Sequence, residues 1–255
     1  MDCKRVSEFL NDNRGNNIFS YDDYLKSSFE NKIKMIKLLN EYYNILLNDS
    51  FINVLPVYVD FDGVIKDTIK CASKLLLDMH DIDYYTHSRT NVDQDKIVGN
   101  FFRDIDWNYL LDNSDEINYA RKFLTLMNES IIYKPIIYSA FSSEKERKVK
   151  KERFSLMYPG INSLLLSSKY FKECTDKDSV LIDDSDHYLV NWEGKPIHFN
   201  SGSKSIFYSI SDLGEIFYLF PFCTSINKAK NVPWLYDGFK QEYDIKKKRL
   251  VWNKK

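Results

Sequence analysis

The chain has 255 residues, enough for one large domain or for a core with a smaller insert, and ample to bury a hydrophobic centre. Its 36 basic and 37 acidic side chains leave a net charge of −1, so binding to a nucleic-acid polymer would have to rest on a local patch. The four cysteines lie far apart and include no Cys-x-x-Cys pair, which argues against a zinc site and against a disulfide framework.

No segment carries the signs of export or of membrane insertion. The first residues lack an apolar stretch of signal-peptide length, and nothing approaches the ~18 consecutive apolar residues of a membrane helix. With the cysteines read as reduced thiols, this predicts a cytoplasmic protein. The abundance of Lys, Asn, Ile, Tyr and Phe is typical of an A/T-rich coding sequence, as in a low-GC bacterium or its phage. For a phage protein the compartment would be the host cytoplasm.

Residues 1–50 predict a helical N-terminal extension. The first 19 residues are polar and rich in Asn, and we expect them to pack loosely. From Ser20, a suitable N-cap, apolar residues recur at three- and four-residue steps as far as Tyr43, which predicts one amphipathic helix that ends near 48–50. Its apolar face would pack on the flank of a sheet or, in the alternative, form the contact of a homodimer.

An apolar run at 57–65 predicts the first strand, and it contains two carboxylates followed by a glycine. Because side chains alternate along a strand, Asp60 and Asp62 leave the same side of the chain, and Gly63 allows a sharp turn. An EF-hand loop is excluded, since the fifth and sixth positions from Asp60 are aliphatic. The run indicates either a ligand site at the carboxyl end of a strand, as in open α/β sheets, or a plain acidic surface turn.

A long insert separates this strand from the next one. Helical periodicity appears at 67–79 and at 114–127, and the next strand, at 134–139, ends in Ser139. Ser139 follows Asp60 by 79 positions, whereas a strand-helix-strand unit needs only about 30 residues. The surplus predicts a small, mainly helical cap at 66–112 that sits over the carboxylates.

Three more strands complete the predicted core. The strand at 161–168 is followed at once by Lys169, and the strand at 179–184 ends in Asp183 and Asp184. A short strand at 196–199 closes the core.

The remaining segments carry weaker patterns. Residues 144–154 predict a lysine-rich helix whose charges are most simply a solvated face, although Lys148 or Lys151 could reach the cleft. Residues 201–255 predict a C-terminal extension with a last helix at 213–222 and a basic, solvated tail.

Right-handed crossovers make successive strands parallel, so the residues that end them meet at one edge of the sheet. The acids Asp60, Asp62 and Asp183, the hydroxyl of Ser139 and the amine of Lys169 are therefore predicted to converge. This set of groups fits phosphoryl transfer through a covalent aspartyl intermediate. Carboxylates in such proximity require a hard divalent cation, and oxygen ligands favour Mg²⁺ over zinc.

Charge and chemistry assign a role to each group. Asp60 would attack phosphorus, and Asp62 would protonate the leaving oxygen and then activate water. Ser139, Ala140 and Lys169 would bind the phosphate through a hydroxyl, backbone N–H groups and an amine. Asp183 would hold the cation, with Asp184 beside it as a second ligand or as an orienting group.

These residues resemble, in order, motifs I to IV of the haloacid dehalogenase (HAD) superfamily. Motif I reads Asp60-Phe61-Asp62-Gly63-Val64-Ile65, and motifs II to IV are represented by Ser139, Lys169 and Asp183-Asp184. The resemblance implies a Rossmann-like α/β core, formed by 51–65 and 113–200, with Mg²⁺ bound by the Asp60 side chain, the Asp62 backbone carbonyl and Asp183. An acid two positions after the nucleophile is typical of the phosphatase members.

Within that superfamily the chain looks most like the 5′(3′)-deoxyribonucleotidases and their phage and low-GC bacterial relatives. The residues that carry this are Asp104-Ile105-Asp106-Trp107, Tyr138-Ser139 and Leu181-Ile182-Asp183-Asp184, with Trp192 and Gly194 soon after. The family's motif III lysine lies nearer the Asp-Asp pair than Lys169 does, so Lys172 is a rival for that role.

Three aromatic residues bear on the substrate. Phe61, Phe102 and Trp107 could stack on a nucleobase and so select nucleotides, or they could simply form the cap's own small core. The predicted function is a Mg²⁺-dependent phosphatase that acts on nucleoside monophosphates. The alternatives are a phosphatase for another small ester or for a polynucleotide 3′-phosphate end, and an inactive module that binds a phosphorylated ligand.

Overall fold

The computed structural model of the chain describes residues 21–47, 54–87, 90–161, 163–168, 172, 177–199, 205–219, 239–244 and 249–254. The segment at 1–19, Lys169 and most of the predicted basic tail lie outside these described residues.

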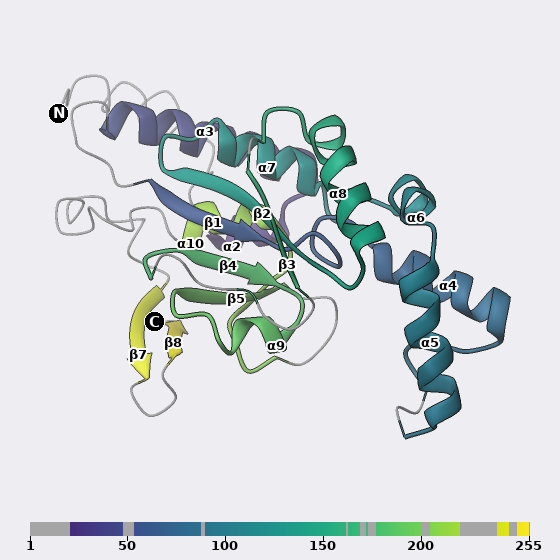
Figure 1. Ribbon diagram of the computed structural model, residues 1–255. Coiled ribbons are helices and arrows are strands. Elements are labelled where there is room, and N and C mark those ends of the chain that lie inside the picture. The colour runs from purple at the N-terminus through teal and green to yellow at the C-terminus, as the bar shows by residue number, and fades with distance from the viewer. Residues whose placement is uncertain are drawn as a thin grey trace.

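A six-stranded sheet forms the centre of the protein (Figure 1). The strand order is β3-β2-β1-β4-β5-β6, and every pair of neighbours is parallel. This confirms the predicted α/β class with a parallel sheet. The strands are β1 (Leu55–Val59), β2 (Tyr133–Phe141), β3 (Leu164–Ser168), β4 (Val180–Asp183), β5 (Lys195–Phe199) and β6 (Ser209–Ile210).

The strand that the sequence places first lies at the middle of the sheet. Val59, the last residue of β1, pairs with Ile137 of β2 and with Ile182 of β4. The backbone N–H of Asp60 donates to the carbonyl of Ile182 at 2.9 Å. This register brings the ends of β1, β2 and β4 to one edge of the sheet, where parallel α/β sheets bind their ligands.

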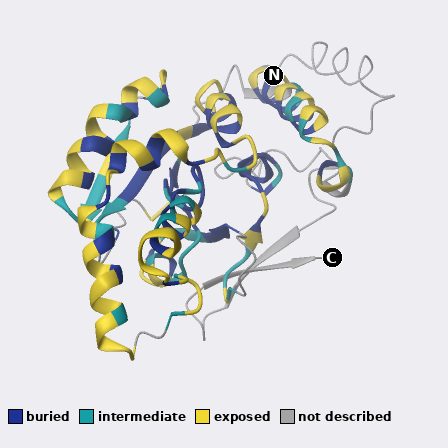
Figure 2. Ribbon diagram, turned by 90° about the vertical axis from the view of Figure 1, so that its right-hand side faces the viewer, coloured by how far each residue is buried: buried dark blue, intermediate teal, exposed yellow. Residues whose placement is uncertain are grey.

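Both faces of β1 are covered by apolar side chains. Val57 and Val59 belong to the larger hydrophobic cluster, whereas Tyr58 belongs to a smaller one with Tyr138 and Trp192. A strand buried on both faces reads as a nearly continuous apolar run. In Figure 2 buried residues gather on the strands and the inward faces of the helices, while the outward helix faces are exposed.

Helices flank the sheet, and α3 lies alongside α7 (Figure 1). The Asn40 side-chain amide of α3 donates to the Leu126 carbonyl of α7 at 2.9 Å. Among the described residues, no helix combines the length and the apolar content that a membrane span requires. The helices are α2 (Tyr21–Lys26), α3 (Phe29–Leu47), α4 (Thr68–His80), α5 (Val92–Asp104), α6 (Trp107–Asn113), α7 (Ala120–Asn128), α8 (Glu144–Met157), α9 (Asp186–Leu189) and α10 (Ile216–Leu219), with the 3₁₀ helix η1 (Leu213–Glu215).

The single N-terminal helix expected from residue 20 onwards is two helices, α2 and α3. The Ser27 hydroxyl donates to the Asp23 carbonyl at 2.8 Å, and the Ser27 N–H donates to the Tyr24 carbonyl at 3.1 Å. Ser28 then accepts a bond from the Asn31 N–H at 3.4 Å. Serine side chains compete for backbone groups in this way and so interrupt a helix whose apolar periodicity continues across the break.

The helix expected to begin at Ser114 begins at Ala120. The Ile117 N–H donates to the Ile65 carbonyl at 3.0 Å, and Glu116 forms an antiparallel bridge with Lys66. Tyr119 has a left-handed φ of 58°, which a continuing helix excludes. Residues 116 and 117 therefore pair with the segment after β1, and the helix begins later than the Ser114 start signal predicts.

The helices α4, α5 and α6 follow β1 in the chain and stand together beyond the edge of the sheet (Figure 1). The buried ammonium of Lys66, at the entry to this insert, donates to the carbonyls of Leu111 and Ser114 at its exit. The insert is thus helical where a cap was predicted, while its boundaries at 66 and 112 stay a prediction.

The C-terminal segment contains two strands where the sequence predicted only an extension with a solvated tail. The described residues there form an antiparallel pair, β7 (Phe239–Asp244) and β8 (Arg249–Lys254). The last helix expected at 213–222 is found as η1 and α10, which reach Leu219, and the residues beyond lie outside the description.

A buried ion pair joins the N-terminal helices to η1. The Lys32 ammonium lies 2.7 Å from Asp212 Oδ2, with side-chain exposures of 8% and 0%. The Tyr24 hydroxyl donates to Asp212 Oδ1 at 2.5 Å. The Asp212 carboxylate also caps η1 by accepting from the Gly214 N–H at 3.0 Å.

Asp212→Asn is expected to reduce the free energy of unfolding by about 3 kcal/mol, because it leaves the Lys32 ammonium buried without its counter-charge. Urea denaturation monitored by circular dichroism would measure the loss. The double variant Lys32→Met/Asp212→Asn should recover a large part of it, since the unpaired charge is then removed. Equal losses for the single and double variants would show that the ion pair is not the source of the effect.

Candidate active site

The turn after β1 brings two carboxylates to the edge of the sheet. Asp60 follows the strand directly and is 5% exposed. Gly63 has a φ of +84°, and a Cβ at this position would collide with the carboxylate of Asp184. Glycine is therefore required here both by the backbone conformation and by the approach of an acid from β4.

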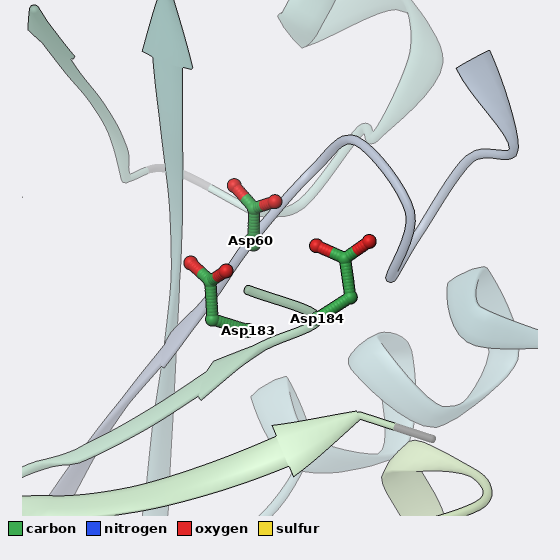
Figure 3. Close-up of side chains that lie close together, drawn as sticks. All are labelled: Asp60, Asp183 and Asp184. Carbon is green, nitrogen blue, oxygen red and sulfur yellow. The ribbon is translucent and has the colours of Figure 1, made fainter. Parts of the chain in front are cut away.

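Three acids from two strand ends lie together at this edge (Figure 3). Asp60 follows β1, and Asp183 and Asp184 lie at the end of β4. Each offers a carboxylate oxygen, and these oxygens all lie within 4.8 Å of one another. The structure thus brings together three of the four acids predicted to bind a cation, from positions far apart in the sequence.

A buried lysine lies between two of these acids. The ammonium of Lys172 is 2.5 Å from Asp60 Oδ1 and 2.6 Å from Asp183 Oδ2, and its side chain is fully buried. Burial alone would lower the pKa of Lys172, but the two carboxylates raise it above its usual range. Lys172, the rival residue of the sequence prediction, therefore contacts two acids of the cluster, and the placement of Lys169 lies outside the described residues.

The acid cluster carries more negative charge than this lysine can balance. Burial raises the pKa of Asp60 and of Asp183 above the usual carboxyl range, although Lys172 opposes the rise. Burial and the neighbouring Asp183 raise the pKa of Asp184 to about 7. A divalent cation would relieve this repulsion, and a donor set made only of carboxylate oxygens suits Mg²⁺ better than zinc.

Asp62 faces a different set of partners. Its Oδ1 accepts from the Thr68 hydroxyl at 2.6 Å, and its Oδ2 accepts from the Ser139 hydroxyl at 3.1 Å and from the Lys150 ammonium at 2.5 Å. The Asp62 side chain is not part of the three-acid group, so the structure does not bring this predicted ligand into it. The role expected of its backbone carbonyl stays a prediction.

Lys150 and Glu146 of α8 are the site residues that sequence reasoning missed. The Lys150 side chain is only 3% exposed, and its ammonium lies 2.7 Å from Glu146 Oε1 and 2.9 Å from Ser139 Oγ. Burial would lower the pKa of Lys150, but Asp62 and Glu146 raise it. Lys148 is 76% exposed and Lys151 is also exposed, as expected for the solvated face of this helix, so neither is the lysine that reaches the cleft.

A signal for this pair was present in the sequence. Glu146 and Lys150 share one face of the helix with Val149 and Phe154, because their positions differ by three, four and eight residues. All four side chains are buried. A charged residue on the apolar face of a helix is rarely buried unless it is paired with an opposite charge. An acid and a base that lie four residues apart on such a face are therefore candidates for a buried polar site.

A cavity of about 800 Å³ extends from the acids to the α4–α6 insert. Asp60, Asp62 and Asp184 line one end of it. Phe102 and Trp107 line the part formed by the insert, and Ala140 lies on the sheet side. A cavity of this size, with a few polar groups at one end and rings at the other, is typical of a small-molecule site.

Two of the three predicted stacking residues therefore line the cavity, and the third does not. Phe61 is 3% exposed, belongs to the hydrophobic core and packs edge-on against Tyr158 at a ring-centroid distance of 6.0 Å. Along the chain it lies between Asp60 and Asp62, so its side chain leaves the opposite face. The same alternation that directs the two acids to the site thus directs this ring to the core.

The sequence matches no protein family model and no curated protein. Solved structures with a similar fold include a protein of Bacillus subtilis described as the HAD-hydrolase YfnB bound to magnesium, with a TM-score of 0.46 and 13% identity over 67% of this chain and 100% of the other. A HAD-superfamily hydrolase of subfamily IA from Geobacter sulfurreducens has a TM-score of 0.43 and 12% identity, over 65% of this chain and 96% of the other. A haloacid dehalogenase-like hydrolase from Xanthomonas campestris has a TM-score of 0.37 and 11% identity, over 65% of this chain and 93% of the other.

The affinity for Mg²⁺ is expected to increase as the pH rises through 7. A cation binds the ionised carboxylates, and the pKa of Asp184 is about 7, so protons compete with the metal below that pH. The dissociation constant, measured by isothermal titration calorimetry, should fall at least about tenfold between pH 6 and pH 8. Asp184→Asn should bind more weakly and with less dependence on pH. An affinity of the unaltered protein that is the same at both pH values would contradict the proposed ligand set.

Proposed function

We propose that the protein is a Mg²⁺-dependent phosphomonoesterase of the HAD type, which acts through an aspartyl-phosphate intermediate. The observation that carries the proposal is the position of Asp60, a buried carboxylate at the edge of a parallel sheet, within reach of two further acids and a buried lysine. The order of these groups along the chain is that of the four HAD motifs.

In the first step a carboxylate oxygen of Asp60 attacks the phosphorus of the ester, and the bond from phosphorus to the leaving oxygen breaks. Asp62 gives a proton to that oxygen. In the second step Asp62 takes a proton from water, the water oxygen attacks phosphorus, and inorganic phosphate leaves with Asp60 restored. Mg²⁺ held by Asp60, Asp183 and Asp184 would offset the negative charge of the phosphate and so allow an anionic nucleophile to approach it.

The buried lysines complete this assignment. Lys172 touches the nucleophile Asp60, while Lys150 touches both Asp62 and the Ser139 hydroxyl. Ammonium groups and hydroxyls beside the reacting phosphate stabilise the charge on its equatorial oxygens. Thr68 and Lys150 hold the two carboxylate oxygens of Asp62 in place. A fixed orientation suits the role of Asp62, which must give a proton to the leaving oxygen and later take one from water.

The alternative class is a module that binds a phosphorylated ligand without turnover. Asp60, Asp62 and Asp183 are all present and hydrogen-bonded, which favours the enzyme, because a decayed site would be expected to lose an acid. Release of phosphate decides between the two.

Asp60→Asn is expected to lower kcat for p-nitrophenyl phosphate by at least about 10³-fold, because the amide cannot act as the nucleophile. Phosphate release would be measured with Mg²⁺ and with EDTA, and only the first condition should give turnover by the unaltered protein. Asp78→Asn changes an exposed acid on α4 and should keep full activity.

Circular dichroism would confirm that Asp60→Asn is folded. Full activity of the folded Asp60→Asn variant would refute the aspartyl-phosphate mechanism. Absence of turnover by the unaltered protein on every ester tested would favour the binding module.

The aromatic part of the cavity supports nucleoside monophosphates as the substrates. Phe102 and Tyr84 meet there at a ring-centroid distance of 5.3 Å, and the Trp107 ring lies 4.7 Å from the Lys150 ammonium. A nucleobase that stacks on an aromatic ring gains about 1–3 kcal/mol. Another small phosphate ester, or the 3′-phosphate end of a polynucleotide, would use the same chemistry and is tested by the same substrate panel.

Phe102→Ala is expected to lower kcat/KM for thymidine 5′-monophosphate by about tenfold, which corresponds to about 1.4 kcal/mol of lost stacking. A phosphate assay with a panel of nucleotides and sugar phosphates would show whether the loss is confined to substrates that carry a base. Tyr109→Ala removes an exposed ring of α6 and serves as the control. An equal loss on sugar phosphates would indicate that Phe102 supports the cap and does not contact a base.

A further inference from the structure

One face of α5 looks into the cavity. Asp95, Val98, Gly99, Phe102 and Arg103 all line it. These positions follow the spacing i, i+3, i+4, i+7 and i+8, which is one side of an α-helix. Gly99 lies at the middle of this face, with a lining residue one turn before it and another one turn after it.

Gly99 is not required by the backbone. It lies inside a regular α-helix, and a Cβ built at this position meets no heavy atom within 4 Å. Glycine is the poorest helix former apart from proline, and any side chain that faces open space would suit the helix better. The glycine therefore has no role in the conformation or the packing of α5, and its effect is to leave bare backbone towards the cavity.

The bare surface lies where a leaving group would be placed. The same cavity is lined by Asp60, the nucleophile, and by Asp62, the proton donor to the leaving oxygen. The group attached to that oxygen must extend away from the acids, and the insert lies on that side of the sheet edge (Figure 1). Phe102 and Trp107 offer rings beside the open stretch of helix.

We propose that Gly99 determines the size of the substrate, because the bare face of α5 makes room for a bulky, ring-containing leaving group beside Phe102. This inference rests on the proposed phosphatase function and goes beyond it by naming the residue that sets the substrate size. Enzymes discriminate by pocket shape in this way, since a group that no longer fits costs roughly 10- to 200-fold in kcat/KM.

The test compares phenyl phosphate with 1-naphthyl phosphate, which differ by one fused ring and share the same reacting bond. Gly99→Phe should lower the ratio of kcat/KM for naphthyl over phenyl ester at least about tenfold. Gly99→Leu should lower it by a smaller amount. Ile97→Phe adds a ring to α5 at a position that does not line the cavity, and should leave the ratio as it is in the unaltered protein.

Thermal denaturation shows which Gly99 variants are folded, and only the kcat/KM ratios of folded variants are compared. Gly99→Ala should melt at a higher temperature than the unaltered protein, because alanine is the better helix former and meets no neighbour. If Gly99→Phe does not fold, Gly99→Leu decides the outcome. An unchanged ratio in a folded Gly99 variant would overturn the role of Gly99 while leaving the phosphatase intact. No phosphate release from either ester by the unaltered protein with Mg²⁺ would overturn the proposed function and this inference with it.

Discussion

The ammonium of Lys172 lies between the carboxylates of Asp60 and Asp183, and the arrangement of the site depends on this contact. Acids buried side by side repel one another, and burial further disfavours their ionised forms. With three carboxylates and one ammonium, the ionised cluster keeps a formal charge of −2. The charge of a divalent cation would balance this −2. Binding of the cation would therefore remove the repulsion between the carboxylates. A second buried lysine, Lys150, lies between Asp62 and Glu146, two acids outside the three-acid group, so these carboxylates also have a buried counter-charge.

The sheet supplies the precision that this electrostatic arrangement needs. Asp60 follows β1 directly, Ser139 lies in β2 and Asp183 ends β4, so their positions are fixed by the pairing of β1 with β2 and with β4. Gly63 lets the chain turn away immediately afterwards without touching Asp184. The reactive groups are therefore held by rigid elements, whereas the part that would contact the remainder of a substrate is provided by the separate helices α4 to α6.

The sequence predicted those parts of the structure that depend on local pattern. Apolar runs that end in Asp60, Ser139 and Asp183 identified strands and the edge at which they meet, because a buried parallel strand has a distinctive composition. Lys150 has no strand pattern of this kind, since most of its neighbours on α8 are exposed charged residues and its partners Asp62 and Ser139 come from the turn after β1 and from β2. Only its i, i+4 spacing from Glu146 on the apolar face of α8 indicates the site. The break between α2 and α3 and the late start of α7 depend on local hydrogen bonds, and for α7 also on a β-bridge, which apolar periodicity does not reveal. The sequence leaves two alternatives for Phe61, a stacking ring or a core residue, and the strand alternation turns it into the core.

The central place of β1 also has a consequence for how the protein is made. β1 ends at Val59, and its two neighbours end 82 and 124 residues later, at Phe141 and Asp183. During synthesis the hydrophobic strand at 55–59 therefore lacks its partner β2 until Phe141 has been made and its partner β4 until Asp183 has been made. Because β4 ends in Asp183, a predicted metal ligand, the pairing of β4 with β1 also brings the acids together, and a nascent chain that ends before Asp184 cannot carry the complete acid cluster.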